Sequence, residues 1–365
     1  MRVIERGRIM TSLPLLVTVF FFLSISCSKE DGPCVTCPPA SVDTTSHNFS
    51  WTTTLLGDGG GSVLSDVVIV NDTLAYAVGG IYSKDSMGNF DPNSYNLLMW
   101  DGAVWTPVRI QFFTICGQVS RTAYPASGVF AFSSTDIWIA MHGDQVARWN
   151  GNVQTATMCL PISFSLKKIW GENSTSVYAV GDGGNIVHFN GSSWQSLASG
   201  TRLDLRDIWG AVDRCTGEQQ ILAVGTRNNP LDRTILRIQG SSVTPVSTAQ
   251  IPYELFGVWF VPNQRYFVVG DGIFEKNDLS ENAWRKVPPD ITMFATTAIR
   301  GNALNDAVIV GAFGEVLHYN GSTWQSFRSQ TSIADGAYTS VAMKGNLIIA
   351  VGGSGAQAIA VVGRR

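Results

Sequence analysis

Short runs of apolar and β-branched residues, each broken by glycine or asparagine, recur along most of the chain. In the clearest copy, residues 166–197, the apolar runs IWG, SVYAV and NIVHF are followed by the turn NGSS and by WQSL. Runs of four to six β-forming residues bounded by Gly and Asn predict strands, and Asn190-Gly191 favours a tight turn. The unit therefore predicts a four-stranded antiparallel meander, whose strands are called a, b, c and d in chain order.

The unit returns at a regular interval. The glycine after strand b falls at positions 181, 225, 270, 311 and 352, at intervals of 44, 45, 41 and 41 residues. Earlier copies begin near residues 67 and 130. This period is typical of propeller blades, which bury their faces by stacking radially. The sequence predicts an all-β, seven-bladed β-propeller of four-stranded antiparallel blades.

The two ends of the repeat region complement each other. The last copy, residues 339–362, stops after strand c, whereas a spare strand-like segment, 47–55, precedes the first copy. Trp51 in that segment matches Trp194 and Trp324 of strand d. We therefore expect the N-terminal strand to complete the last blade, so that residues 47–365 form one propeller.

The N-terminus has the pattern of an export signal. Three arginines and a short apolar run lead to LSISC, which resembles a bacterial lipobox ending at Cys27. We expect residues 1–26 to be a lipoprotein signal peptide, Cys27 to carry the lipid and residues 27–46 to be a tether. Ordinary cleavage after Ser26 is the alternative. The following SKED resembles the export tag of surface lipoproteins in Bacteroidetes-type bacteria, which favours an outer-membrane, surface-exposed protein over one facing the periplasm.

Composition narrows the class of partner. The chain is 45% hydrophobic and 15% charged, with a formal net charge of −3. Removing the signal, which carries +2, leaves −5. A mildly acidic surface argues against nucleic acid, which needs a basic footprint. We expect a monomer that binds a protein or a glycan.

The cysteines suggest an oxidising compartment. A local disulfide is the favoured interpretation of Cys34 and Cys37, with a redox site or half a zinc site as alternatives. Cys116 and Cys159 both follow a strand d, in the first and second blades, which predicts a disulfide between neighbouring loops. Cys215 is expected to remain single.

Two long insertions mark one end of the ring. The b–c loops and d–a connections of a propeller emerge at the same end, and residues 79–96 and 106–128 enlarge one of each in the same sector. Loops of this length are usually functional or disordered; a decorating loop without a ligand is the alternative. The candidate ligand-binding residues in the first insertion are Tyr82, Lys84, Asp85, Asp91 and Tyr95.

The other b–c loops carry polar residues that are expected near the channel mouth, where acids from several blades would hold a cation or a sugar. The simpler alternative is turn chemistry, since Asp beside Gly is common in turns. Trp170, Trp209 and Trp259 share one column of strand a with Arg300, and packing between blades explains them better than sugar stacking. His188 and His318 share a strand-c column that indicates repeated packing. The loop candidates are Asp144, Asp182, Arg227 and Asp271.

Recognisable catalytic patterns are missing from the sequence. It contains no GxSxG, HExxH, phosphate loop, dinucleotide fingerprint or EF-hand loop. We therefore nominate no catalytic residue, metal site or cofactor. The leading hypothesis is a lipid-anchored, non-catalytic binding or scaffold module; the alternatives are a glycan-active hydrolase or lyase with acids at the channel mouth, and an envelope assembly factor.

The stretch from Tyr178 to Trp194, YAVGDGGNIVHFNGSSW, resembles repeats of the photosystem-assembly-factor and BNR-like superfamily of seven-bladed propellers. The resemblance covers residues 47–365. It implies the fold, and it implies a place among assembly factors, sialidase-like enzymes and envelope lipoproteins. The turns read NGSSW and NGSTW where the sialidase Asp-box has Ser-x-Asp-x-Gly-x-x-Trp, and no arginine triad can be placed. Both departures argue against sialidase activity.

Overall fold

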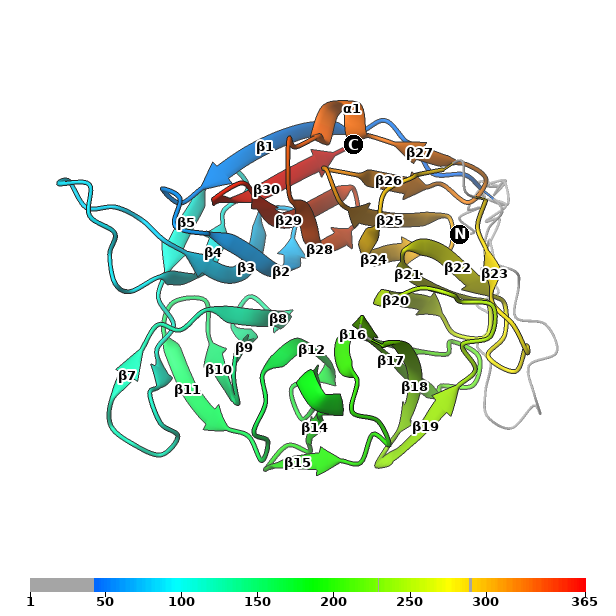
Figure 1. Cartoon of the computed structure of the whole chain (residues 1–365), viewed down its shortest axis with the longest axis horizontal. Helices are drawn as coiled ribbons and strands as arrows, with labels where there is room; N and C mark the ends of the chain where they lie inside the picture. The colour runs from blue at the N-terminus through cyan, green and yellow to red at the C-terminus, as the bar shows by residue number, and fades with distance from the viewer. Residues whose placement is uncertain (1–42, 229, 289–290) are drawn as a thin grey trace, which may run out of the picture. The chain divides into compact units, whose positions relative to one another are not determined.

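The computed structural model describes residues 43–228, 230–288 and 291–365, which form seven four-stranded antiparallel sheets. The sheets are blades set around a common centre (Figure 1). Strand a of each blade contacts strand a of the next, and the seventh blade contacts the first. The seven-bladed prediction is confirmed.

The first six blades each use four strands in chain order from the centre outward. Blade 1 contains β2 (Val63–Asn71), β3 (Leu74–Ile81), β4 (Tyr95–Trp100) and β5 (Trp105–Val108). Blade 2 contains β8 (Ala126–Ser133), β9 (Asp136–Met141), β10 (Gln145–Trp149) and β11 (Gln154–Cys159). Blade 3 contains β12 (Leu166–Asn173), β13 (Ser176–Gly181), β14 (Ile186–Phe189) and β15 (Trp194–Leu197). Blade 4 contains β16 (Asp204–Val212), β17 (Gln219–Asn228), β18 (Leu231–Gln239) and β19 (Ser242–Val246). Blade 5 contains β20 (Leu255–Val261), β21 (Arg265–Gly270), β22 (Gly272–Lys276) and β23 (Arg285–Lys286). Blade 6 contains β24 (Thr296–Ala303), β25 (Asp306–Gly311), β26 (Val316–Tyr319) and β27 (Trp324–Ser326).

Blade 7 joins the two ends of the chain. Strands β28 (Ala337–Lys344), β29 (Leu347–Ser354) and β30 (Gln357–Arg364) are completed by β1 (Ser50–Leu56), which pairs antiparallel with β30 from Ser50↔Arg364 to Leu56↔Ala358. The predicted N-terminal closing strand is confirmed. The remaining elements are the hairpin β6 (Phe112–Phe113) and β7 (Arg121–Thr122), a 3-10 turn η1 (Asp182–Gly184) and the short helix α1 (Arg328–Thr331).

The core lies between blades, where alternate side chains of neighbouring sheets interdigitate. The Trp-Gly pair of strand a explains part of this packing. A Cβ on Gly301 would lie 2.7 Å from Cζ2 of Trp259 in the preceding blade, and a Cβ on Gly210 would overlap the ring of Trp170. Glycine therefore makes room for the neighbouring indole, which confirms packing between blades as the role of these two tryptophans.

The c–d turns share one design. In blade 3, Oδ1 of Asn190 accepts hydrogen bonds from the backbone N–H groups of Ser192 and Ser193, both at 3.0 Å, and Gly191 has φ +93°. Asp101, Asn150 and Asn320 repeat these bonds in blades 1, 2 and 6. The Asn-Gly turn is thus a four-residue loop held by the asparagine side chain.

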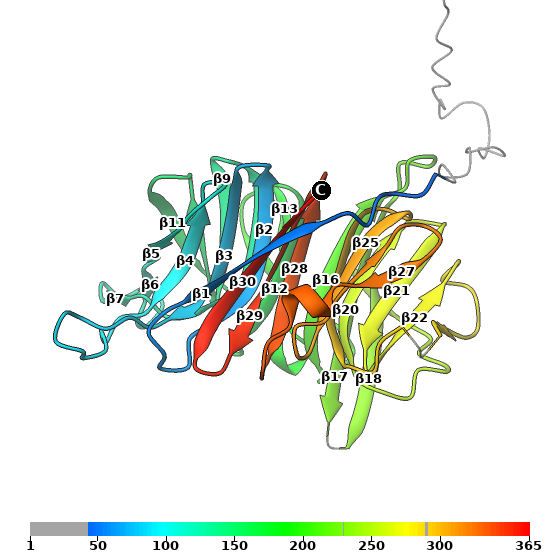
Figure 2. The ribbon, with the colours of Figure 1, turned by 90° about the horizontal axis from the view of Figure 1, so that it is seen from above.

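The connections define two ends of the ring. The a–b and c–d turns lie at one end, called the turn-bearing end, and the b–c loops and d–a connections lie at the other, called the loop-bearing end. In Figure 2 the β17–β18 hairpin projects at the loop-bearing end, opposite the C-terminus.

Candidate functional site

The β3–β4 loop of blade 1 is held by its own polar residues. Lys84 pairs with Phe90 in an isolated bridge, and its ammonium lies 5.0 Å from the centre of that ring. Oδ1 of Asp85 accepts backbone N–H bonds from Met87 at 2.8 Å and Asn89 at 2.9 Å. The Asn89 bond is the main reason that the pKa of Asp85 is lowered. Tyr82 donates its backbone N–H to Ser62 Oγ at 2.9 Å.

The base of this loop is joined to the next connection. Asp91 forms an ion pair with Arg109, whose guanidinium carbon lies 4.0 Å from the centre of the Tyr95 ring. Buried Asn96 donates to the carbonyls of Ile110 at 2.9 Å and Tyr124 at 2.7 Å. The predicted residues Asp85, Asp91 and Tyr95 therefore help to order the loop, and Met87 and Phe90 are the large apolar residues among the exposed residues 84–90 at its tip.

The polar residues predicted on the other b–c loops have separate local partners. Asp182 lies 3.1 Å from Lys167 Nζ, and Arg227 lies 3.6 Å from Asp232. Asp271 is exposed beside a cavity of about 290 Å³ that Lys286 and Phe294 also line. Asp144 is half-buried, and its carbonyl accepts the N–H of Leu160. The part of the chain that the structure describes brings no three His, Cys, Asp or Glu residues together as a metal site.

Exposed apolar side chains gather at the loop-bearing end. Fourteen large hydrophobic residues are exposed among the described residues, including Met293 at 89% and Met87 at 81%. Four of them lie elsewhere: Leu55, Val104, Val153 and Val212. The other ten lie in, or at the edge of, b–c loops and d–a connections: Val63, Met87, Phe90, Ile115, Val119, Phe164, Leu231, Tyr253, Met293 and Phe313. Sequence reasoning named the end but chose the polar residues, because loop hydrophobics carry no periodic signal.

A disulfide fastens the largest d–a connection. Cys116, beyond β6, is bonded to Cys159 at the end of β11, as the sequence predicted. Cys215 is also disulfide-bonded, so the expectation that it stays single is wrong. Cys27, Cys34 and Cys37 lie outside the described residues, as do the predicted signal and most of the tether. Among the described helices, none has the length and apolar character needed to cross a membrane.

The central channel contains a buried ion pair that sequence reasoning missed. Asp66 is fully buried on strand a of blade 1, and its carboxylate accepts a hydrogen bond from the ammonium group of Lys168 in blade 3. It also accepts the N–H of Val129 in blade 2 at 3.0 Å and the hydroxyl of Ser340 in blade 7 at 2.7 Å. One carboxylate therefore ties four consecutive blades.

A second ion pair repeats this design on the other side of the channel. Asp207 of blade 4 accepts two hydrogen bonds from Arg300 of blade 6, at 2.7 and 2.9 Å, and the N–H of Val258 in blade 5 at 3.0 Å. In both cases the blade between the two charged partners has a glycine directly after the bulge of strand a. This glycine is Gly128 in blade 2 and Gly257 in blade 5. Because the charged groups of both pairs already have partners, they tie neighbouring blades together and are not free to bind a charged ligand.

Between these pairs and the turn-bearing end, the channel holds a cavity of about 200 Å³. Phe130, Trp170, Trp209 and Met343 line it, and Arg300 lies 5.1 Å from the centre of the Trp209 ring. Trp170 and Trp209 thus both border the channel cavity, whereas Trp259, whose ring packs on Gly301, does not line it. No Asp or Glu lines this cavity in the described part of the chain.

Comparison with known proteins identifies the fold. No family model matches the sequence. No curated protein matches it either. Among solved structures, the chain is similar to YCF48 bound to a D1 peptide, with 16% identity, coverage of 89% of this chain and 100% of that one, and a TM-score of 0.63. The WD40 propeller of Doa1 gives 15% identity, coverage of 87% and 98%, and a TM-score of 0.63. A catalytically inactive virginiamycin B lyase from Staphylococcus aureus, with quinupristin, has 10% identity, coverage of 86% of this chain and 99% of that one, and a TM-score of 0.61. At these identities the likeness shows that the chain shares the β-propeller fold of these proteins.

Proposed function

We propose that this protein is a non-catalytic binding module that holds a protein partner on its loop-bearing end. The observation that carries the proposal is that ten of the fourteen exposed large hydrophobic side chains among the described residues lie at that end. Exposed apolar residues that cluster on one face mark interaction sites, whereas scattered ones do not. Methionine and aromatic residues are also enriched in protein interfaces.

The chemistry of this end favours a protein over a sugar. Aliphatic and methionine side chains such as Val119, Met87 and Met293 offer a sugar's hydroxyl groups no donor and at most a weak thioether acceptor. A hydrolase would need a pair of carboxylates roughly 5–10 Å apart at a concave site, and the channel cavity is lined by none in the described residues. Propellers with the same fold, YCF48 with its D1 peptide among them, support protein binding.

The position of the N-terminal segment fits a lipid anchor at Cys27, which we include in the proposal. The described chain enters the ring at the turn-bearing end, where the Asp43 carbonyl accepts a hydrogen bond from Asn305 at 2.5 Å. An anchor upstream of this point would join the ring at the turn-bearing end and leave the loop-bearing end without an attachment. We infer an outer-membrane lipoprotein with this end presented to the outside of the cell.

Matched surface variants test the binding end. A triple variant, Met87→Ser, Phe164→Ser and Met293→Ser, changes the loop-bearing end, and the pair Val104→Ser and Val153→Ser changes large apolar residues that are also exposed, at the turn-bearing end. Affinity capture from envelope fractions is expected to recover the same partner with the wild type and with the turn-end pair, and to lose it with the triple variant. If the triple variant still captures the partner and the turn-end pair does not, the binding site lies at the turn-bearing end and the proposal is contradicted.

The anchor has a separate test. Cys27→Ala is expected to release the protein from the membrane fraction while leaving capture of the partner unchanged, because the anchor and the loops lie on different parts of the chain. Membrane retention of Cys27→Ala would rule out lipidation at this residue without affecting the assignment of the binding end.

A further inference from the structure

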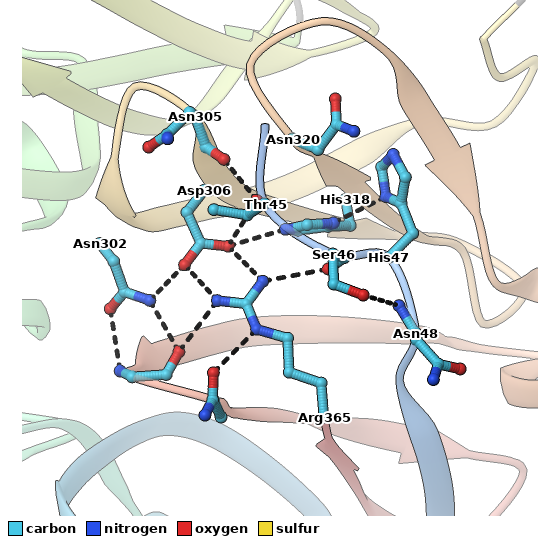
Figure 3. Close-up of polar contacts among 12 residues, drawn as sticks. Thr45, Ser46, His47, Asn48, Asn302, Asn305, Asp306, His318, Asn320 and Arg365 are labelled. Carbon is cyan, nitrogen blue, oxygen red and sulfur yellow. Dashed lines mark hydrogen bonds and ion pairs between the residues drawn. The ribbon is translucent and has the colours of Figure 1, made fainter. Parts of the chain in front are cut away.

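The segment that leads into β1 crosses the turn-bearing end of blade 6. Residues 43–49, called the strap, are fastened there by several hydrogen bonds (Figure 3). Thr45 donates its hydroxyl to the Asn305 carbonyl at 2.5 Å and its N–H to the Asn320 carbonyl at 3.2 Å. The strap thus positions β1 before it pairs with β30.

Two histidines form the centre of this contact. Nδ1 of His47 in the strap lies 2.8 Å from Nδ1 of His318 in β26, and the two rings meet edge to face at 4.8 Å. His318 is completely buried, and its Nε2 lies 2.8 Å from Oδ1 of Asp306. Nε2 of His47 lies 3.1 Å from the hydroxyl of Thr323.

The carboxylate of Asp306 sets the direction of the hydrogen bonds. Burial alone would raise its pKa, but hydrogen bonds from His318, Arg365 and Asn302 outweigh burial and lower the pKa to about 2. Asp306 is therefore ionised and only accepts, so Nε2 of His318 carries the hydrogen. In neutral His318 this leaves Nδ1 as an acceptor, and His47 must donate through its own Nδ1.

Positive charge also faces His47. Arg365, which follows β30, donates to the Ser46 carbonyl at 3.1 Å and forms two bonds to Asp306, at 2.8 and 2.6 Å. The single carboxylate is thus already matched by Arg365. Asp306 from β25, His318 from β26 and Arg365 are the charged or titratable groups that face His47 among the described contacts. Burial, His318 and Arg365, in that order, lower the pKa of His47 below 6.5.

We infer that His47 and His318 form an acid-sensitive latch that holds the closing strand on the ring through the single hydrogen between their two Nδ1 atoms and releases the strand when a second hydrogen enters that contact. A separation of 2.8 Å between two Nδ1 atoms accommodates one hydrogen. With a hydrogen on each of the two Nδ1 atoms, two N–H groups face each other and their bond is lost, beside the fixed charge of Arg365. The closed pair therefore binds fewer protons than the open pair.

The sign of the pH dependence follows from that difference. A histidine whose pKa is lower in the folded state stabilises the closed form above its unfolded pKa of about 6.5, and this stabilisation is lost as the pH falls through the folded pKa. If the open form binds one proton more than the closed form, the ratio of closed to open molecules falls by up to about tenfold for each unit by which the pH decreases.

Amide hydrogen exchange of the full chain tests the latch. Between pH 7.5 and 5, after correction for intrinsic exchange rates, protection of residues 43–56 is expected to fall up to about tenfold per pH unit below about 6.5, while β16 in blade 4 stays protected. His47→Gln, which cannot be protonated, is expected to remove this slope. His188→Gln is the matched control, because His188 has the same strand-c position but stacks on Tyr178 at 4.1 Å; it should keep the slope.

Three results would overturn the latch: a flat profile in the wild type, an unchanged slope in His47→Gln, or a slope removed by His188→Gln. A second measurement needs no variant. Titration of the wild-type imidazoles by NMR is expected to show His47 protonating below pH 6.5, and protonation at or above 6.5 would contradict the latch.

Discussion

The two ends of the propeller are built from the same blades and differ in what their connections do. At the turn-bearing end, short turns satisfy their own backbone groups, and Asp306 joins the strap, blade 6 and the C-terminal residue through His318 and Arg365. At the loop-bearing end, long connections carry most of the exposed apolar side chains. One end therefore closes the ring, and the other is free to vary its surface, which is why binding is assigned to the latter.

The same contrast appears within one column of strand c. His188 and His318 occupy equivalent positions, yet His188 stacks on Tyr178, whereas His318 is bonded to Asp306 and His47. The difference arises because the strap and Arg365 contact blade 6 beside His318. The repeat therefore determines where the strand lies, and contacts with residues outside the repeat determine the interactions of its side chains.

The largest effect is expected at the turn-bearing end. Asp306→Ala removes the carboxylate that pairs with Arg365 and His318 and should lower the free energy of unfolding by about 3 kcal/mol, as for a broken buried ion pair. The folded pKa of Asp306, about 2 against 3.8, means that its contribution is present above about pH 4 and lost as the pH falls through about 2. Denaturant titrations should therefore show the difference between wild type and variant shrinking below pH 4.

The control for this change is Asp271→Ala, which removes an exposed carboxylate at the loop-bearing end and should alter stability by no more than about 0.5 kcal/mol. Equal losses for Asp306→Ala and Asp271→Ala would contradict the stabilising role of the turn-bearing end.

A smaller effect is expected in a single turn. Asn190→Ala leaves the N–H groups of Ser192 and Ser193 without their acceptor and should cost about 1 kcal/mol. Asn190→Asp keeps an oxygen acceptor at the same place and should recover most of the loss in thermal or denaturant unfolding. If both variants are equally unstable, the turn is not held by this side chain.

The smallest effect on stability is expected at the loop-bearing end. The triple change of Met87, Phe164 and Met293 to serine removes exposed side chains and should shift the free energy of unfolding by no more than roughly 0.5 kcal/mol per site. A cooperative loss of several kcal/mol would show that these side chains support the fold, and the comparison between the two ends would fail.

The fold was predictable because each blade repeats the same local pattern. The glycine period, the missing last strand and the spare segment around Trp51 together predict a ring closed by β1. The bond between Cys116 and Cys159 was predictable for a related reason: connections that follow strand d in neighbouring blades emerge side by side at the same end of the ring.

The stabilising polar contacts could not be predicted in the same way. Asp66 and Lys168 are two blades apart, as are Asp207 and Arg300, so no local pattern links them. A signal was present in hindsight, since both pairs skip a blade with glycine at the equivalent position, Gly128 or Gly257. The role of His318 was hidden because its column suggested packing alone, and its partner His47 precedes the repeats.

The most direct test of the central claim is photocrosslinking of the full-length protein in intact cells. A photoreactive phenylalanine derivative is placed at Met293 on the loop-bearing end or at Val104 on the turn-bearing end, both of which are exposed. We predict a discrete protein adduct from position 293 and none from position 104. An adduct from position 104 alone would contradict the assignment of the loop-bearing end as the binding end.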